Sequence, residues 1–428
     1  MKTMMEIIRD LTPLNRNIIS DECDRAVDYL CSVLPFRVIR YRSGEDYNGW
    51  IIPDSWDLVD ARILKEGRLV YDATRTPLCV IALSKPFHGR VSREELRNHL
   101  HYDHRYEDAV PYHYRQQFRP WARDWGFCVP RRLFESLEEG PYDVVLETRE
   151  KPGEMKILEF THKGITGWTV VFGSNLDHPG VSNDGLAGCV AGIEILRRLQ
   201  GRKTKFSYRL VLSPGIIGSE YYLGKMEGGE REKILEGVFL EMLGSKTELA
   251  FQQSKDGLSN IERCVLNKIR GETLPCRVGP FRSIIINDEY LWEAYGIPMP
   301  SLSRFPYPEY HSSMDTPSII SEESLEEAVA LLLAAVEDLE STPFVEKQFE
   351  GTICLSNPRY DLYMDYGQIA FGERPDEHLK KMRLLMDLVP TLSRLTSIDY
   401  VSETLGLPAG VVREYLSRWV AKGLLNIF

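Results

Sequence analysis

The stretch WTVVFGSNLDHPGVSNDGLAGCVAGIEILRRLQG, residues 168–201, runs from an apolar segment through a polar turn into a second, longer apolar segment. Its first part, WTVVFGSN, shows little alternation of polar and apolar residues, which is typical of a strand covered on both faces. Its last part, from DGLAG onward, has the length and composition of a helix. The turn between them carries His178 and Asp184 at the expected carboxyl end of the strand.

Strands and helices of this kind alternate over residues 121–343. The other predicted strands are FSYRLVLS (206–213), GVFLEML (237–243) and RSIIIN (282–287), and YDVVLETR with GEMKILEF (142–160) predicts a hairpin. The predicted helices include GSEYYLGKM (218–226) and SLEEAVALLLAAVEDLES (324–341). This alternation predicts an α/β/α sandwich with a mixed, mostly parallel sheet. Ligands of such sheets bind beyond the carboxyl ends of the strands.

The segments on either side have other patterns. Residues 1–34 have helical spacing, and short β-rich runs such as FRVIRYR and RLVYDA indicate a small antiparallel module, followed by a His-rich connector. The C-terminal residues are expected to form helix, turn, helix and strand, the order of a winged helix. We therefore predict an α/β domain of residues 1–34 and 121–345, an inserted β domain with its connector at 35–120, and a link with a winged helix at 346–428.

Charge and cysteine usage exclude several classes of protein. The 428 residues include 52 Lys+Arg and 63 Asp+Glu, a net charge of −11, which argues against partners held by phosphate, whether nucleic acid or an anionic membrane. The second helix of the predicted winged helix has mixed charge, so we expect it to contact a protein partner or a second copy of the chain rather than DNA. The eight cysteines form no C-x-x-C pair, and the N-terminus lacks a signal peptide, as expected of a soluble cytoplasmic protein with reduced thiols.

Four residues at predicted strand ends have side chains that bind metals. They are His178, Asp184, Glu241 and His311. Each has an ordinary alternative explanation: Asp184 could cap a helix, Glu241 could pair with a basic residue, and the segment around His311 could be a turn. Together, these nitrogen and oxygen donors form a set suited to zinc.

Longer motifs resemble a known family. HPGVSNDGLAG, LEMLG and YHSSMDTP resemble motifs of zinc aminopeptidases and carboxypeptidases. The whole chain is more similar to a bacterial aminopeptidase-like family of largely unassigned function, whose members often accompany surface-polysaccharide genes. The matching segments are Ser43–Trp56, Trp125–Cys128, His178–Gly188 and Glu309–Asp315. The resemblance implies a zinc-exopeptidase-like fold with an inserted β domain and a C-terminal winged helix.

The resemblance also implies roles for the four residues. His178 matches the first metal ligand, Asp184 the carboxylate that bridges two metals, and Glu241 and His311 the remaining ligands. An alternative alignment places Asn175 at the first position, and we prefer His178 because asparagine is a poor zinc ligand. Where the family has a pair of glutamates, this chain reads LSPGIIGS (212–219), without a carboxylate. We therefore expect one tightly bound zinc rather than two, with Glu220, Asp288, Glu289 and Glu309 as the nearby acids that could replace the missing base.

Two functions follow from this pattern. The first is zinc-dependent hydrolysis of an amide bond in a small peptide or an acylated metabolite. The second is a catalytically degenerate relative that binds a ligand or partner in a biosynthetic pathway. The four ligand-type residues favour the enzyme, and the missing glutamates favour the binding protein.

Overall fold

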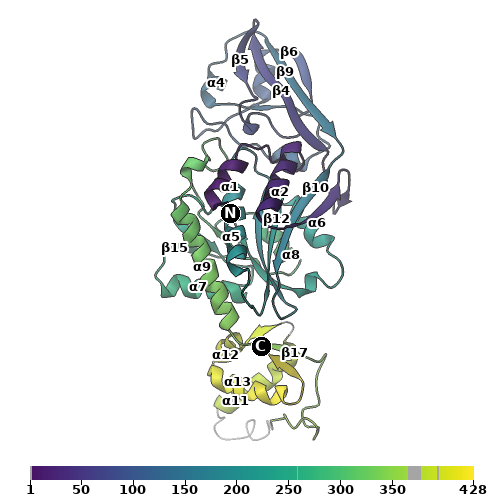
Figure 1. Ribbon diagram of the computed structural model, residues 1–428, viewed down its shortest axis with the longest axis vertical. Coiled ribbons are helices and arrows are strands. Elements are labelled where there is room, and N and C mark those ends of the chain that lie inside the picture. The colour runs from purple at the N-terminus through teal and green to yellow at the C-terminus, as the bar shows by residue number, and fades with distance from the viewer. Residues whose placement is uncertain (1, 258, 365–376, 393–394) are drawn as a thin grey trace. The chain divides into compact units, whose positions relative to one another are not determined.

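The computed structural model describes residues 2–257, 259–364, 377–392 and 395–428. The chain forms two compact units, Met1–Ala335 and Val336–Phe428. Figure 1 shows the elements of each unit, and the two units are described separately.

The larger unit is built on an eight-stranded mixed sheet with the order β1-β10-β12-β11-β13-β16-β14-β15. The central pairs β12–β11, β11–β13 and β13–β16 are parallel, as is β14–β15, whereas β1–β10, β10–β12 and β16–β14 are antiparallel. The strands are β1 (Arg37–Arg42), β10 (Glu154–His162), β11 (Thr169–Asn175), β12 (Ser207–Ser213), β13 (Ile234–Leu240), β14 (Leu249–Gln252), β15 (Cys276–Gly279) and β16 (Ser301–Ser303). This mixed, mostly parallel sheet agrees with the prediction.

Helices pack on both faces of the sheet. On one face α5 (Gly188–Leu199) packs so closely that a Cβ on Gly192 would lie 2.5 Å from Leu210 of β12. On the other face, side chains of α6 (Ile217–Gly224) and α8 (Glu289–Ala294) share an apolar core with Val171 and Phe239 of the sheet. Four further helices begin in this unit: α1 (Met4–Leu11), α2 (Asp21–Val33), α7 (Asn260–Gly271) and α9 (Glu322–Ser341) (Figure 1).

The larger unit also contains a smaller, four-stranded antiparallel sheet with the order β5-β4-β9-β6. Its strands are β4 (Ser55–Lys65), β5 (Arg68–Asp72), β6 (Phe87–Val91) and β9 (Tyr142–Lys151), accompanied by α3 (Arg93–Asn98) and α4 (Arg131–Glu135). Two short strand pairs, β2 (Asp46–Tyr47) with β3 (Trp50–Ile51) and β7 (Leu100–His101) with β8 (Phe127–Cys128), lie outside both sheets. A separate apolar core, which includes Trp56, Tyr71 and Phe127, underlies the four-stranded sheet.

Three local predictions differ from the structure. The predicted hairpin at 142–160 is wrong, because β9 pairs with β4 and β6 while β10 pairs with β1 and β12. The chain passes between the two sheets at Pro152–Gly153. As a result, β1 lies within the predicted β-domain range but belongs to the large sheet, and β9 belongs to the small one. Residues 282–287 are not a strand; the amides of Ile284 and Ile285 donate to the side chain of Gln252 instead.

Among its described residues, the smaller unit contains the helices α11, α12 and α13 and an antiparallel sheet with the order β18-β17-β19. These elements are β17 (Phe344–Lys347), α11 (Glu377–Leu388), β18 (Thr396–Ser397), α12 (Ile398–Leu405), α13 (Ala409–Val420) and β19 (Leu425–Ile427). Val401, Leu416 and Trp419 are among its buried core residues. The order of α12, α13 and β19 agrees with the predicted helix, turn, helix and strand. Over the described ranges, no helix combines the length and apolar character needed to cross a membrane.

Candidate metal centre

The chain kinks sharply between β11 and α5, and this kink places Asp184. Asp184 has φ −76° and ψ 108°, and Gly185 has φ 88° and ψ −63°, so neither is helical. A Cβ on Gly185 would lie 2.7 Å from the carbonyl oxygen of Asn175, which explains the glycine. Asp184 is therefore not the N-cap of α5, whose helical residues begin at Gly188.

His178, Asp184 and His311 lie together. The Nε2 atom of His311 is 2.9 Å from Asp184 Oδ2, and the Nε2 atom of His178 is 3.6 Å from the same oxygen. One donor atom from each of the three side chains lies within 4.8 Å of the other two. Two ligands at tetrahedral angles around a zinc ion, each at about 2 Å, would be about 3.3 Å apart, and the two contacts of Asp184, at 2.9 and 3.6 Å, lie on either side of that value.

The surroundings of the Asp184 carboxylate also fit a metal here. Its Oδ2 atom is buried, and its close polar neighbours are the Nε2 atoms of His311 and His178. Burial opposes ionisation of Asp184, but His178 and His311 outweigh it, so the pKa of this carboxyl lies below its ordinary value. An ionised carboxylate between two imidazoles is a donor set suited to zinc.

Asp315 fixes the backbone that leads to Asp184. Its Oδ1 accepts from the amide of Asn183 at 2.7 Å, and its Oδ2 accepts from the amide of Asp184 at 3.0 Å and the hydroxyl of Tyr307 at 2.7 Å. Asp315 lies four residues after His311 but directs both of its oxygens to this turn and to Tyr307. It joins the turn at 178–184 to the segment that carries His311.

Glu241 lies beside the three residues but outside their group. It follows the last residue of β13, is 1% exposed, and neither carboxylate oxygen has a hydrogen-bond partner. Burial, with the charges of Glu289 and Asp184, raises the pKa of Glu241 well above its ordinary value. Of the four residues expected as metal ligands, the structure thus groups His178, Asp184 and His311, and Glu241 lies outside the group.

A second cluster occupies the sheet edge next to Glu241. The Nδ2 atom of Asn175 donates to Asn287 Oδ1 at 3.0 Å, and the amide of Gly215 donates to Asp177 Oδ1 at 2.7 Å. A Cβ on Gly215 would lie 3.1 Å from Asn175 Nδ2 and 3.2 Å from Asp177 Oδ1. Where the resembling peptidases have glutamates, this chain therefore packs its backbone tightly against two polar side chains.

The four acids that could replace the missing base differ in how many hydrogen bonds their carboxylates already accept. Asp288 accepts from the amide of Ile216 at 2.8 Å and the hydroxyl of Ser219 at 2.5 Å, and burial raises its pKa to about 7. Glu220 accepts at 3.0 Å from both Asn48 and Tyr295.

Glu289 is fully buried, accepts from Gln252 at 2.9 Å, and retains one oxygen without a partner. Glu309 is partly exposed, and its carbonyl accepts from Ser312 in the turn that carries His311. Unlike Asp288 and Glu220, which accept hydrogen bonds from two groups each, Glu241 and Glu289 have buried carboxylate oxygens without hydrogen bonds.

The connector contributes an aromatic side chain, Tyr112, that contacts both histidines and was not predicted from the sequence. The ring of Tyr112 lies 5.3 Å from that of His178 and 5.2 Å from that of His311, and Tyr310 stacks on His311 at 3.8 Å. The amide of Tyr112 donates to the carbonyl of His311 at 2.9 Å, which helps to hold His311 at a φ of 54°. The signal was the run PYHY at 111–114, which we had considered a connector.

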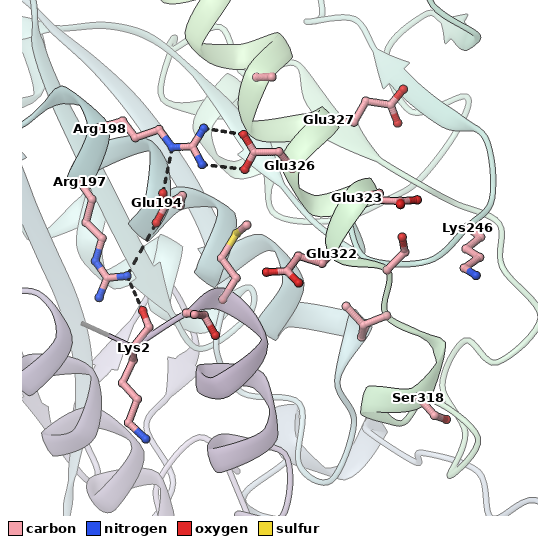
Figure 2. A pocket seen from close by; sticks show the side chains of 15 residues that line it. Lys2, Glu194, Arg197, Arg198, Lys246, Ser318, Glu322, Glu323, Glu326 and Glu327 are labelled. Carbon is pink, nitrogen blue, oxygen red and sulfur yellow. Dashed lines mark hydrogen bonds and ion pairs between the residues drawn. The ribbon is translucent and has the colours of Figure 1, made fainter.

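A wide depression of about 1070 Å³ lies elsewhere on the larger unit, and Figure 2 shows its lining. Its two arginines already have partners: Arg198 contacts Glu326 at 2.6 Å through two nitrogens, and Arg197 donates to the carbonyl of Lys2 at 2.9 Å. None of the four predicted metal ligands lines it. The chemistry therefore belongs to the sheet edge.

Comparisons with known proteins agree with the fold. A family model described as "Domain of unknown function (DUF4910)" matches residues 5–342. A Clostridium acetobutylicum protein named "Putative polysaccharide biosynthesis protein with aminopeptidase-like domain" is 25% identical over 343 residues, which cover 78% of this chain and 77% of that protein.

Two solved structures share the architecture. A "putative peptidase" from Clostridium acetobutylicum is similar with a TM-score of 0.74 and 21% identity, covering 99% of this chain and 96% of its own. A zinc aminopeptidase from Bacillus subtilis is similar with a TM-score of 0.57 and 16% identity, covering 78% of this chain and 94% of its own. The chain thus has an aminopeptidase-like α/β fold.

Proposed function

The chain belongs to the family described as Domain of unknown function (DUF4910), and from its aminopeptidase-like fold we propose that it is a zinc-dependent hydrolase of an amide bond. The observation that carries the proposal is the grouping of His178, Asp184 and His311 within 4.8 Å of one another. Three protein ligands with an open fourth position are the usual arrangement of a catalytic zinc.

Zinc held by these residues would polarise the amide carbonyl and lower the pKa of a bound water. Asp184, ionised between the two imidazoles, supplies the negative charge at this position. Glu241 is the residue that we assign to proton transfer, because both of its oxygens are free of hydrogen bonds. A raised pKa makes the ionised form of a carboxyl a stronger proton acceptor than an ordinary carboxylate. Glu289, with one free oxygen, is the second choice.

We propose one tightly held zinc per chain. A second zinc would need its own ligands, and Asn175 is hydrogen-bonded to Asn287 while Gly215 has no side chain to offer. Glu241 and a shared Asp184 would leave that site with two protein ligands, and catalytic zinc sites usually have three.

The enclosure of the site supports a small substrate. Tyr112 is buried against both histidines, and the side chains of His178 and His311 are 13% and 19% exposed. A short peptide or a small acylated metabolite suits this enclosure.

Metal analysis with a substrate screen tests the proposal. We expect purified protein supplemented with zinc to retain about one ion, and His178→Ala and His311→Ala each to lose it. His88→Ala is the matched control, since His88 is exposed on β6 in the small sheet. Slow hydrolysis of aminoacyl or N-acyl amides is expected in the wild type only. Failure of the wild type to retain zinc, or retention of zinc by both alanine variants, would refute the proposal.

The alternative is a catalytically inactive relative that binds a ligand in a biosynthetic pathway. The occupied carboxylates of Asp288 and Glu220 favour it, because two of the four acids considered as bases are already hydrogen-bonded. The name of the Clostridium relative suggests polysaccharide biosynthesis as the setting. Zinc binding without turnover of any amide in the screen would support this alternative.

A further inference from the structure

Arg16 lies in the segment between α1 and α2, and its side chain is fully buried. Burying a guanidinium costs several kcal/mol or more unless its donors are satisfied and its charge is compensated. A buried arginine outside the proposed ligand set therefore calls for an explanation.

Every hydrogen bond that Arg16 makes goes to a backbone carbonyl oxygen. Its Nε donates to Leu176 at 3.2 Å, and one terminal nitrogen donates to Val181 at 2.8 Å and also to His178. The other terminal nitrogen donates to Leu11 and, at 3.5 Å, to Thr12. A guanidinium has five N–H donors, and five carbonyl oxygens surround this one.

The five carbonyls come from two places. Two belong to the C-terminal end of α1, where helix carbonyls lack partners and favour a cation. Three belong to the turn at 176–181 that carries His178. α1 is itself well anchored, with a capping box formed by Thr3 and Glu6 and with five buried apolar residues. Arg16 thus ties the turn to a fixed helix end.

The charge of Arg16 is compensated across the turn. Burial lowers the pKa of Arg16 to about 10, and the negative charges of Asp177 and Asp315 act in the opposite direction, so the side chain stays cationic at neutral pH. Asp315 accepts hydrogen bonds from the backbone amides of residues 182–184. The carbonyls of the turn therefore contact the Arg16 cation, and the amides of residues 182–184 contact the Asp315 carboxylate.

We propose that Arg16 is a positioning residue of the metal centre, which holds the turn at 176–181 so that the imidazole of His178 faces Asp184 and His311. This inference rests on the proposed zinc site. Lysine keeps the charge but has three donors on one nitrogen, so it cannot reach carbonyls on both α1 and the turn in the same planar fork. The arrangement therefore requires arginine in particular.

Zinc affinity of the full chain, measured by competition with a chelating dye, tests the proposal. We expect Arg16→Lys to bind zinc about 10–100-fold more weakly than the wild type, the usual effect of removing a residue that orients a ligand. Arg304→Lys is the matched control. Arg304 is 5% exposed and donates to the carbonyl of Thr247 at 2.7 Å, outside the turn. It should lose thermal stability without losing zinc affinity.

The outcomes separate this inference from the zinc site itself. A wild type that binds no zinc would refute the proposed function. A wild type that binds zinc, with Arg16→Lys folded and equal to it in affinity, would refute the positioning role alone. Arg16→Gln, which keeps two amide donors, is the second variant if Arg16→Lys does not fold. Failure of both to fold would mark Arg16 as a residue needed by the core and would also overturn the proposal.

Discussion

Buried acids with different partners crowd the sheet edge. Asp184 lies between two imidazoles, which lower its pKa, whereas burial and neighbouring acids raise the pKa of Glu241. Asp288, with two donors of its own, has a pKa raised to about 7, chiefly by burial. Neighbouring carboxyls whose surroundings separate their pKa values can take different roles in acid–base chemistry. Asp184 therefore supplies the negative charge in the proposed function, and Glu241 exchanges the proton.

A second zinc should require changes at two positions. Gly215→Glu alone adds a carboxylate, but its Cβ would press on Asn175 and Asp177 at 3.1–3.2 Å, and the carboxylate of Asp177 would repel it. We expect this variant to be less stable by about 1–3 kcal/mol, the usual cost of overpacking, and to hold one zinc. Gly215→Glu combined with Asn175→His adds a nitrogen ligand and should hold two. Metal analysis checks the counts, and two zinc ions in Gly215→Glu alone would contradict the argument.

The individual site residues were predictable to different extents. His178, Asp184 and His311 could be found because each lies in a polar motif after an apolar run. The motifs also predicted that they act together. The kink at Gly185 and the contact of Tyr112 in the connector with His311 could not be predicted, because they depend on the folded chain. Arg16 carried no local signal of its role, since its contacts with the turn are with backbone atoms about 160 residues away in sequence.

Contacts between elements also involve ionisable groups away from the metal centre. Glu236 lies in β13 and accepts at 2.8 Å from the amides of Asn260 and Ile261, the first two residues of α7. These amides have no partner within the helix, so the carboxylate of a strand caps a neighbouring helix. Burial nevertheless raises the pKa of Glu236 to about 7.

The stability of the protein should therefore depend on pH through Glu236. A carboxyl with a raised pKa binds its proton more tightly in the folded state, so folding stability falls as pH rises from 4.5, its ordinary value, to about 7. Glu236→Gln removes this titration, and the free energy of unfolding should decrease less steeply across that window than in the wild type. Chemical denaturation at several pH values checks this. Parallel curves for the two proteins would show that Glu236 titrates normally.

At the scale of elements, continuous apolar runs predicted strands well where two helical layers cover them. β11, β12 and β13 lie within the predicted segments or overlap them, and α9 spans its predicted helix. The strand predicted at RSIIIN (282–287) is wrong because apolar β-branched residues also occur in exposed loops, and Ile286 is 64% exposed. The hairpin failed because a turn such as Pro152–Gly153 can pass a chain from one sheet to another as readily as it reverses it.

The larger unit has the aminopeptidase-like fold, and the smaller unit follows it in the chain. The family match ends at residue 342, close to the division of the chain into units after Ala335. The domain ranges predicted from the sequence did not include the sheet membership of β1 and β9, because strand pairing over long separations leaves no local pattern. We propose that the C-terminal unit contacts a protein partner or a second copy of the chain.

The C-terminal unit should not select a DNA sequence. Its second helix in the helix–turn–helix order, α13, carries Glu414 between Arg413 and Arg418, so no uniformly basic face is available for phosphates. Arg418 already donates to the carbonyl of Asp361 at 3.2 Å, and Lys422 donates to that of Arg359 at 3.4 Å. With a net charge of −11 on the chain, any attraction to DNA should be weak and should vanish as salt is raised. A gel-shift assay with the full chain and a random oligonucleotide pool checks this. Enrichment of one sequence at physiological salt, lost in Arg413→Glu, would show that α13 reads DNA despite its mixed charge.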